Sequence, residues 1–207
     1  MPNGNDGQEP AALAKLRSLA KVAHPAAKKA AMKKVVVIGP ESTGKSTLCK
    51  QLADHYGVSW VPEYARQYLL QHGTSYTYND LLTIAKCQLA LEEEYVAAAK
   101  GPVLFVDTDM YVMKVWCEFV FGKCHQWILD RIAERTCDLY FLCDIDLPWV
   151  QDGLREYPDI KNRQRLYHIY KDILINQRVP WREISGSEEQ RLQKAIIATD
   201  RLLRHID

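Results

Sequence analysis

The feature that most constrains this chain is a short apolar run that leads directly into a glycine-rich turn. Residues 35–38 are Val-Val-Val-Ile, and residues 39–46 read Gly-Pro-Glu-Ser-Thr-Gly-Lys-Ser. Glycine tolerates the unusual dihedral angles of such a turn and lets the backbone approach an anion closely. The pattern G-x-x-x-x-G-K-[ST] after a buried strand therefore predicts a phosphate-binding loop that opens a helix.

The turn assigns a role to each of its side chains. Lys45 is expected to reach the β- and γ-phosphates, and the Ser46 hydroxyl is expected to hold Mg²⁺ where the helix dipole also attracts anions. A purely structural turn is the alternative, but the β-branched strand before it and a helical pattern that stops at Gly57 favour binding of a nucleoside triphosphate. The predicted nucleotide contacts are Gly39, Glu41, Ser42, Thr43, Gly44, Lys45, Ser46 and Thr47.

Length, charge and cysteine spacing exclude several classes of protein. A chain of 207 residues suits one α/β domain, expected over residues 32–207, with residues 1–31 as an appendage. The net charge of +1 argues against a nucleic-acid surface. The six cysteines lack zinc-site spacing and are expected to be free thiols. Without a long apolar run or a signal-peptide core, a soluble cytoplasmic protein is expected.

Strands and helices are expected to alternate along the domain. Each short apolar strand is followed by a helical pattern, which predicts parallel crossovers and a sheet covered on both faces. A polar, arginine-containing loop is expected over residues 144–165, with a helix after it to about residue 178. The expected strands are 35–38, 58–61, 102–106, 139–143 and 181–184, and the clearest further helices are 110–121, 125–135 and one that Asn79 and Asp80 can cap.

Acidic side chains follow two of the expected strands. In a parallel sheet, ligands bind outside the carboxyl ends of the strands. Asp107 follows a run of apolar residues and is expected to hold Mg²⁺ through water, although it could instead cap the next helix. Glu63 follows the second strand and is a candidate general base toward an acceptor hydroxyl, with Asp107 and Asp109 as competing carboxylates. All three carboxylates are expected to lie near one another.

Cationic and aromatic side chains complete the predicted site. Phosphoryl transfer needs positive charge on a mobile segment, and Arg155 is favoured over Arg163 and Arg165, which could belong to an exposed helix face. Tyr64 and Trp116 are favoured for stacking on a planar base because each closely follows a crevice-lining acid. The full set of aromatic candidates near strand ends is Trp60, Tyr64, Tyr68, Trp116 and Trp149.

These motifs together resemble the ribosylnicotinamide kinase domain of the NadR family, in the P-loop nucleoside and nucleotide kinase group. The similarity runs from about Lys33 to the C-terminus. It implies an α/β, three-layer P-loop kinase fold with a five-stranded parallel sheet flanked by helices. It also implies ATP and Mg²⁺ as cofactors and transfer of the γ-phosphoryl group to the 5′-hydroxyl of nicotinamide riboside. The residues that carry it are 39–48, 63–66, 107–109 with Trp116, and 146–155.

The resemblance also implies residue roles. Lys45 and Ser46 would bind phosphate and Mg²⁺, Asp107 would hold the metal or the acceptor hydroxyl, and Arg155 would contact the transferred phosphate. With Glu63 as the candidate base argued above, the predicted catalytic residues are Lys45, Glu63, Asp107 and Arg155. A cationic nicotinamide ring would suit the acidic and aromatic neighbours Glu63, Tyr64, Asp109 and Trp116. The nucleotidyltransferase and DNA-binding activities of full-length relatives are not expected, because a chain of this length has no room for those domains and no H-x-G-H nucleotidyltransferase signature occurs.

Two alternatives stay open on the sequence. A kinase for another nucleoside or nucleotide would use nearly the same phosphate loop, acid and arginines, and would differ in the acceptor pocket. A regulatory P-loop ATPase would consume ATP without phosphorylating a small molecule. A GTPase switch is disfavoured because the chain lacks an N-K-x-D motif. The patterns do not specify an oligomeric state.

Overall fold

Five parallel strands form a single sheet in the order β2-β3-β1-β4-β5. The structure is a computed structural model that describes residues 32–134 and 136–204, so the predicted appendage lies outside the described residues. The sheet confirms the predicted fold class. Its strands are β1 (Lys33–Ile38), β2 (Trp60–Val61), β3 (Val103–Asp107), β4 (Leu139–Cys143) and β5 (Trp181–Ile184).

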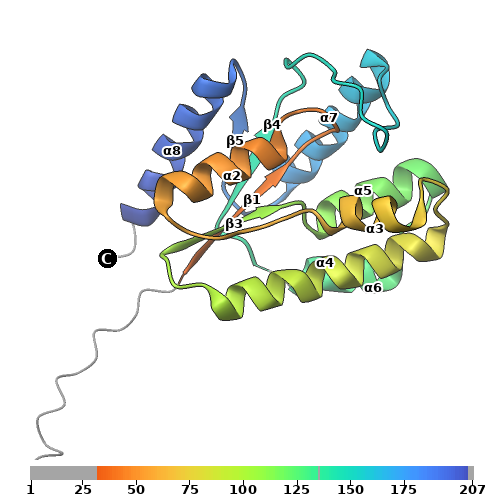
Figure 1. Cartoon of the computed structure of the whole chain (residues 1–207), viewed down its shortest axis with the longest axis horizontal. Helices are drawn as coiled ribbons and strands as arrows, with labels where there is room; N and C mark the ends of the chain where they lie inside the picture. Colours follow the sequence, from red (N-terminus) through yellow and green to blue (C-terminus); the bar gives the residue numbers. More distant parts are fainter. Residues whose placement is uncertain (1–31, 135, 205–207) are drawn as a thin grey trace, which may run out of the picture. The chain divides into compact units, whose positions relative to one another are not determined.

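Helices cover both faces of this sheet, which gives the predicted three layers (Figure 1). The helices α2 (Lys45–Tyr56) and α8 (Glu188–Arg204) pack on one face. On the other face lie α5 (Met110–Phe121) and α7 (Ile160–Asn176). A further helical group consists of α3 (Tyr64–His72), α4 (Tyr78–Ala98) and α6 (Gln126–Glu134), which pack with α5 in a third apolar cluster.

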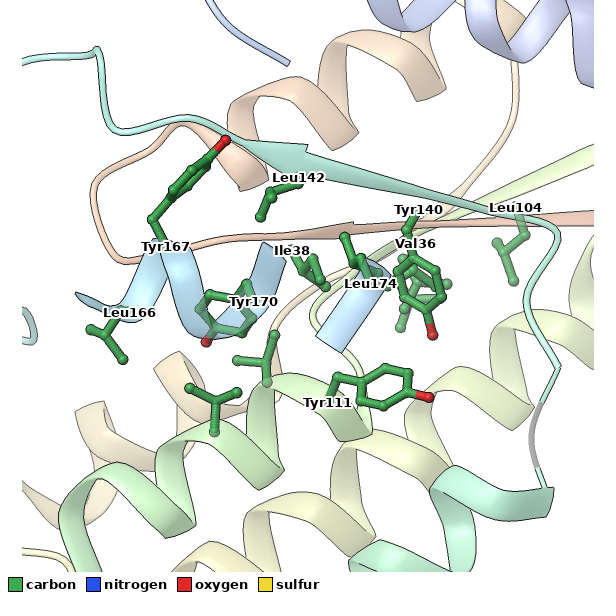
Figure 2. Close-up of a cluster of buried hydrophobic side chains, with 14 residues drawn as sticks. Val36, Ile38, Leu104, Tyr111, Tyr140, Leu142, Leu166, Tyr167, Tyr170 and Leu174 are labelled. Atoms are coloured by element: carbon green, nitrogen blue, oxygen red, sulfur yellow. The ribbon is translucent and has the colours of Figure 1, made fainter. Parts of the chain in front are cut away.

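The central strands β1, β3 and β4 are largely apolar because both of their faces are buried, whereas the edge strand β5 exposes Arg182 and Glu183. In β1, Val35 and Val37 pack toward α2 and α8, whereas Val36 and Ile38 pack toward α5 and α7. Figure 2 shows the apolar cluster on the face covered by α5 and α7, in which Val36 and Ile38 lie near the side chains of α7. Successive side chains of a strand point to opposite faces, so a strand buried on both sides reads as a continuous apolar run.

Several predicted boundaries needed correction. The second strand is only two residues long. Of the two predicted caps of α4, Asp80 takes part in the cap and Asn79 does not: Thr77 is the N-cap, and the Asp80 side chain completes a capping box with it. Helix α7 begins at Ile160, where the carboxylate of Asp159 accepts a hydrogen bond from Asn162 N. The loop between β4 and α7 therefore ends well before residue 165. No helix in the described part of the chain combines the length and apolarity of a membrane span.

The buried centre of the sheet is expected to dominate stability. Phe105 in β3 is fully buried, so Phe105→Ala should lower the free energy of unfolding by about 3–5 kcal/mol, measured by urea denaturation. Leu70→Ala is the matched control because Leu70 is 69% exposed, and it should change stability by less than about 0.5 kcal/mol. Equal effects of the two substitutions would contradict this description of the core.

Candidate active site

The predicted phosphate-binding loop occupies the carboxyl end of the central strand β1. Gly39 has φ 144°, and a Cβ atom on it would lie 2.8 Å from the carbonyl oxygen of Cys143 in β4. Gly44 is the left-handed N-cap of α2. The hydroxyl of Thr43 donates to the carbonyl of Pro40 over 2.8 Å, and Lys45 Nζ donates to the same carbonyl over 2.9 Å. Glycine is therefore required at position 39 by the neighbouring strand as well as by the turn.

A serine–carboxylate pair lies beside this loop. Ser46 Oγ donates to Oδ2 of Asp107 over 2.5 Å, while Oδ1 of the fully buried Asp107 has no hydrogen-bond partner among the described residues. Burial, followed by the nearby charge of Glu63, raises the pKa of Asp107 to about 7. A buried carboxylate with a free oxygen next to a hydroxyl fits a hard divalent cation.

The site offers few protein ligands to a metal ion, and this small number suits Mg²⁺. The described residues contain no group of three His, Cys, Asp or Glu side chains able to hold a metal ion. Mg²⁺ is commonly held by one or two protein groups and completes its shell with substrate phosphates and water. The donor set of Ser46 and Asp107 beside a phosphate-binding loop is consistent with that kind of site.

A cavity of about 210 Å³ opens from the loop. Glu63 and Arg66 line it at the start of α3, and Trp116 lines it from α5. The remaining wall comes from apolar residues of α3, α5 and α7 and from residues 154–157. The cavity therefore joins the phosphate-binding loop, the Glu63 carboxylate and an aromatic wall.

The segment between β4 and α7, residues 144–159, lies against the phosphate-binding loop. Ser42 Oγ accepts hydrogen bonds from Val150 N over 3.0 Å and from Arg155 Nη1 over 3.2 Å. Arg155 also donates to the carbonyl of Val150. Ser42 has φ 57°, an uncommon conformation for a residue other than glycine. The phosphate-loop motif allows any residue at position 42, and in this protein Ser42 accepts the hydrogen bonds that attach the segment to the loop.

Glu41 makes the second attachment of the same segment. Its Oε2 accepts hydrogen bonds from Glu156 N over 2.9 Å and from Tyr157 N over 3.2 Å. Burial raises the pKa of Glu41, and the two amide donors oppose that shift. The Glu41 carboxylate, predicted as a nucleotide contact, is thus already engaged with the backbone of residues 156 and 157.

The predicted arginines differ in their surroundings. Arg155 and Arg163 both lie over the ring of Trp149, at 5.9 and 5.6 Å from its centroid. Arg163 is buried and donates to the carbonyl of Ser42, so it does not belong to an exposed face of α7. Arg165 instead lies over the ring of Phe119 at 5.1 Å. Two of the three predicted arginines, Arg155 and Arg163, therefore border the phosphate-binding loop.

Arg191 is a site residue that no sequence motif indicated. It is buried at the start of α8 and donates to the carbonyl oxygens of Thr43, Asp144 and Gly186. It also forms an ion pair with Asp146. One guanidinium thus connects the phosphate-binding loop to the residues that follow β4 and β5. A lone arginine in an amphipathic helix carries no local signal of such a role.

The structure does not bring Asp109 to the cavity that contains Glu63. Its carboxylate accepts from Tyr111 N over 2.9 Å and from Tyr140 OH over 2.7 Å, and it lines a different cavity of about 350 Å³. The reason is local, because Thr108 adopts φ 79° and turns the backbone between Asp107 and Asp109. The side chains of Asp107 and Asp109 therefore do not point to the same side, as the side chains of residues two apart in a strand would.

The aromatic candidates also separate. Trp116 lines the cavity beside the loop, whereas the ring of Tyr64 packs against the cluster of α3 to α6 and its backbone amide donates to Gln88 Oε1 over 2.7 Å. Tyr157 lines the cavity as well and was not among the predicted candidates. It lies in an irregular segment, where periodicity gives no indication of which side chain faces a ligand.

Comparison with known families and proteins agrees with this geometry. The family described as AAA domain matches residues 34–191. The chain belongs to the AAA domain family. The loop, Asp107 and the arginines described above, Arg191 included, fall within the matched part of this AAA domain.

Curated relatives of this AAA domain support the predicted resemblance. The trifunctional NAD biosynthesis/regulator protein NadR of Salmonella typhimurium is 26% identical over 160 residues, which are 74% of this chain and 38% of that protein. The NadR protein of Escherichia coli is 28% identical over 146 residues, or 68% of this chain and 35% of that protein. The chain thus spans little more than a third of the length of these relatives.

Solved structures similar to this AAA domain share its fold. NadR protein in complex with NR has a TM-score of 0.66 at 20% identity, covering 84% of this chain and 52% of that one. NadR protein in complex with NAD and AMP-PNP has a TM-score of 0.64 at 21% identity, covering 84% and 50%. Deoxyadenosine kinase from M. mycoides has a TM-score of 0.54 at 11% identity, covering 81% and 99%. The fold of a P-loop kinase is confirmed.

The close approach of the loop to β4 gives a prediction. Gly39→Ala should cost about 2 kcal/mol or more of unfolding free energy in urea denaturation, because the new methyl group meets the Cys143 carbonyl at a positive φ. Gly153→Ala is the control, since nothing lies within 4 Å of its added Cβ. A Gly39→Ala protein as stable as the control would contradict the described packing of the loop.

Proposed function

We propose that this chain is an ATP-dependent kinase that phosphorylates the 5′-hydroxyl of nicotinamide riboside to give nicotinamide mononucleotide. The observation that carries the proposal is the single cavity that joins the phosphate-binding loop, the Glu63 carboxylate and the Trp116 ring. The similarity to NadR proteins, whose structures include complexes with NR and with AMP-PNP, supports this acceptor and this donor.

The donor phosphates would lie on the loop formed by residues 39–47. The backbone amides at the start of α2 and the helix dipole attract anions there. Lys45 Nζ donates to the carbonyl of Pro40, and it would exchange that carbonyl for the β- and γ-phosphates. Ser46 and Asp107 would hold Mg²⁺, which when bound neutralises charge on the β- and γ-phosphate oxygens.

Glu63 is the proposed general base. Asp107 is buried and bonded to Ser46, and Asp109 lines another cavity, so Glu63 is the one of the three predicted carboxylates that lines the cavity beside the loop. The 5′-oxygen attacks the γ-phosphorus while its proton passes to the Glu63 carboxylate. The bond from the γ-phosphorus to the bridging oxygen breaks, and ADP leaves with the electron pair.

The aromatic wall and the arginines would position the two reactants. A cationic nicotinamide ring is attracted to the face of an aromatic ring, and Trp116 presents such a ring to the cavity. Arg155 would leave Ser42 Oγ to contact the transferred phosphoryl group, with Arg163 close behind it. Segment 144–159 would also exclude water from the reacting groups.

The acceptor is tested by incubating the protein with ATP, Mg²⁺ and a panel of nicotinamide riboside, common nucleosides and nucleoside monophosphates, with ADP release and product mass as readouts. We expect conversion of nicotinamide riboside, and a loss of at least about 100-fold in kcat for Lys45→Ala. Lys50→Ala, an exposed lysine of the same helix, should keep full turnover. Phosphorylation of another acceptor would replace the substrate, and ADP release without a phosphorylated product would favour a regulatory ATPase.

The role of Glu63 gives a separate prediction. Glu63→Gln should lower kcat by about 100- to 10,000-fold because the amide cannot accept the hydroxyl proton. Affinity for AMP-PNP should change little, since the loop that binds the phosphates is intact. Glu94→Gln, an exposed change in α4, serves as the control. Normal kcat in Glu63→Gln would move the base assignment to Asp107.

A further inference from the structure

The ring of Trp116 is held by a chain of two hydrogen bonds. Trp116 Nε1 donates to Tyr76 OH over 2.8 Å, and Tyr76 OH donates to Glu156 Oε2 over 2.8 Å. The rings of Tyr76 and Trp116 also meet edge to face, with centroids 5.0 Å apart. These three residues come from the loop before α4, from α5 and from segment 144–159. No motif in the sequence connects them.

The direction of both hydrogen bonds is fixed by chemistry. An indole N–H can only donate and an ionised carboxylate can only accept. Tyr76 OH must therefore give its proton to Glu156 and use a lone pair for Trp116. Burial raises the pKa of Tyr76, and the Glu156 charge adds to that shift, so the phenol keeps the proton that this arrangement needs.

Glu156 also connects these two hydrogen bonds to the phosphate-binding loop. Its main-chain amide donates to the carboxylate of Glu41 over 2.9 Å, and the amide of Tyr157 donates to the same oxygen. The side chain of Glu156 thus fixes the aromatic wall while its backbone is fixed by the loop. Movement of segment 144–159 away from the loop breaks the two hydrogen bonds to Glu41 and displaces Glu156, the residue that accepts the hydrogen bond from Tyr76.

We propose that Tyr76 and Glu156 are positioning residues. They make the orientation of the Trp116 ring toward the acceptor depend on whether segment 144–159 is attached to the phosphate-binding loop. The inference rests on the proposed function, because it takes Trp116 as part of the acceptor pocket. Coupling between two binding sites is reciprocal, so acceptor and ATP should each tighten the binding of the other. Neither positioning residue takes part in proton or phosphoryl transfer.

The test compares Tyr76→Phe, Glu156→Ala and Glu156→Gln with wild type. The KM for nicotinamide riboside is measured, together with the Kd for AMP-PNP with and without nicotinamide riboside. Tyr76→Phe and Glu156→Ala should raise the acceptor KM by about fivefold or more, the effect of one lost hydrogen bond. The AMP-PNP ratio, which is the Kd without nicotinamide riboside divided by the Kd with it, should fall toward 1. Glu156→Gln should recover part of both effects, because its amide oxygen still accepts from Tyr76.

Tyr78→Phe is the matched control. It removes a hydroxyl from a tyrosine two residues away, whose ring stacks on His125 at 3.6 Å, and leaves the chain from Trp116 to Glu156 intact. Its acceptor KM and its AMP-PNP ratio should equal those of wild type. If Tyr76→Phe proves unstable, Glu156→Ala alters an exposed side chain and tests the same bond.

A ligand-free measurement separates this inference from the proposed function. The indole N–H signal of Trp116, assigned by its loss in Trp116→Phe, should shift and exchange faster with solvent in Tyr76→Phe. Wild type that does not phosphorylate nicotinamide riboside overturns the proposed function, and with it the acceptor role of Trp116. Wild type that does phosphorylate it, with unchanged KM and coupling in Tyr76→Phe, overturns this inference alone. A shifted Trp116 indole signal in Tyr76→Phe with unchanged acceptor KM and AMP-PNP ratio would mean that the two hydrogen bonds have only a structural role, and it would also overturn this inference.

Discussion

The candidate site depends on the position of β1 between β3 and β4. The parallel register pairs Val37 with Asp107 on one side and Ile38 with Leu142 on the other. The end of β3 therefore delivers a carboxylate beside the first turn of α2, and the end of β4 delivers segment 144–159 to the opposite side of the loop. Gly39 allows this arrangement because a side chain there would collide with the carbonyl of Cys143. The placement of the acid and of the segment thus follows from strand order.

Arginine side chains from distant parts of the chain surround the phosphate-binding loop. Arg191 donates to the carbonyl of Thr43, and Arg163 donates to the carbonyl of Ser42. Buried guanidinium groups stabilise a structure only where carbonyls or carboxylates satisfy their N–H groups. The ring of Trp149 lies under both Arg155 and Arg163, which keeps two cations close to the phosphate-binding loop. This is an environment suited to an anionic ligand.

The connection from Glu41 to Trp116 gives the two parts of the cavity a common boundary. Glu41 belongs to the phosphate-binding loop, and Trp116 belongs to the aromatic wall of the cavity that Glu63 also lines. Glu156 contacts both, directly at Glu41 and through Tyr76 at Trp116. Under the proposed function, a segment that contacts both the phosphate-binding loop and the aromatic wall would exclude water before the phosphoryl group moves.

The sequence by itself determined the parts of this protein that depend on local backbone preferences. A β-branched run, a glycine pattern and an amphipathic repeat predicted the parallel sheet, the phosphate-binding loop and the strand-end position of Asp107, because each is encoded within a few neighbouring residues. Only the tertiary structure decided that Asp109 turns away at Thr108, that Glu41 holds the backbone of segment 144–159, and that Arg191 and Tyr76 belong to the site. These are contacts between residues far apart in the chain or effects of one unusual φ angle, and neither leaves a periodic signal in the sequence.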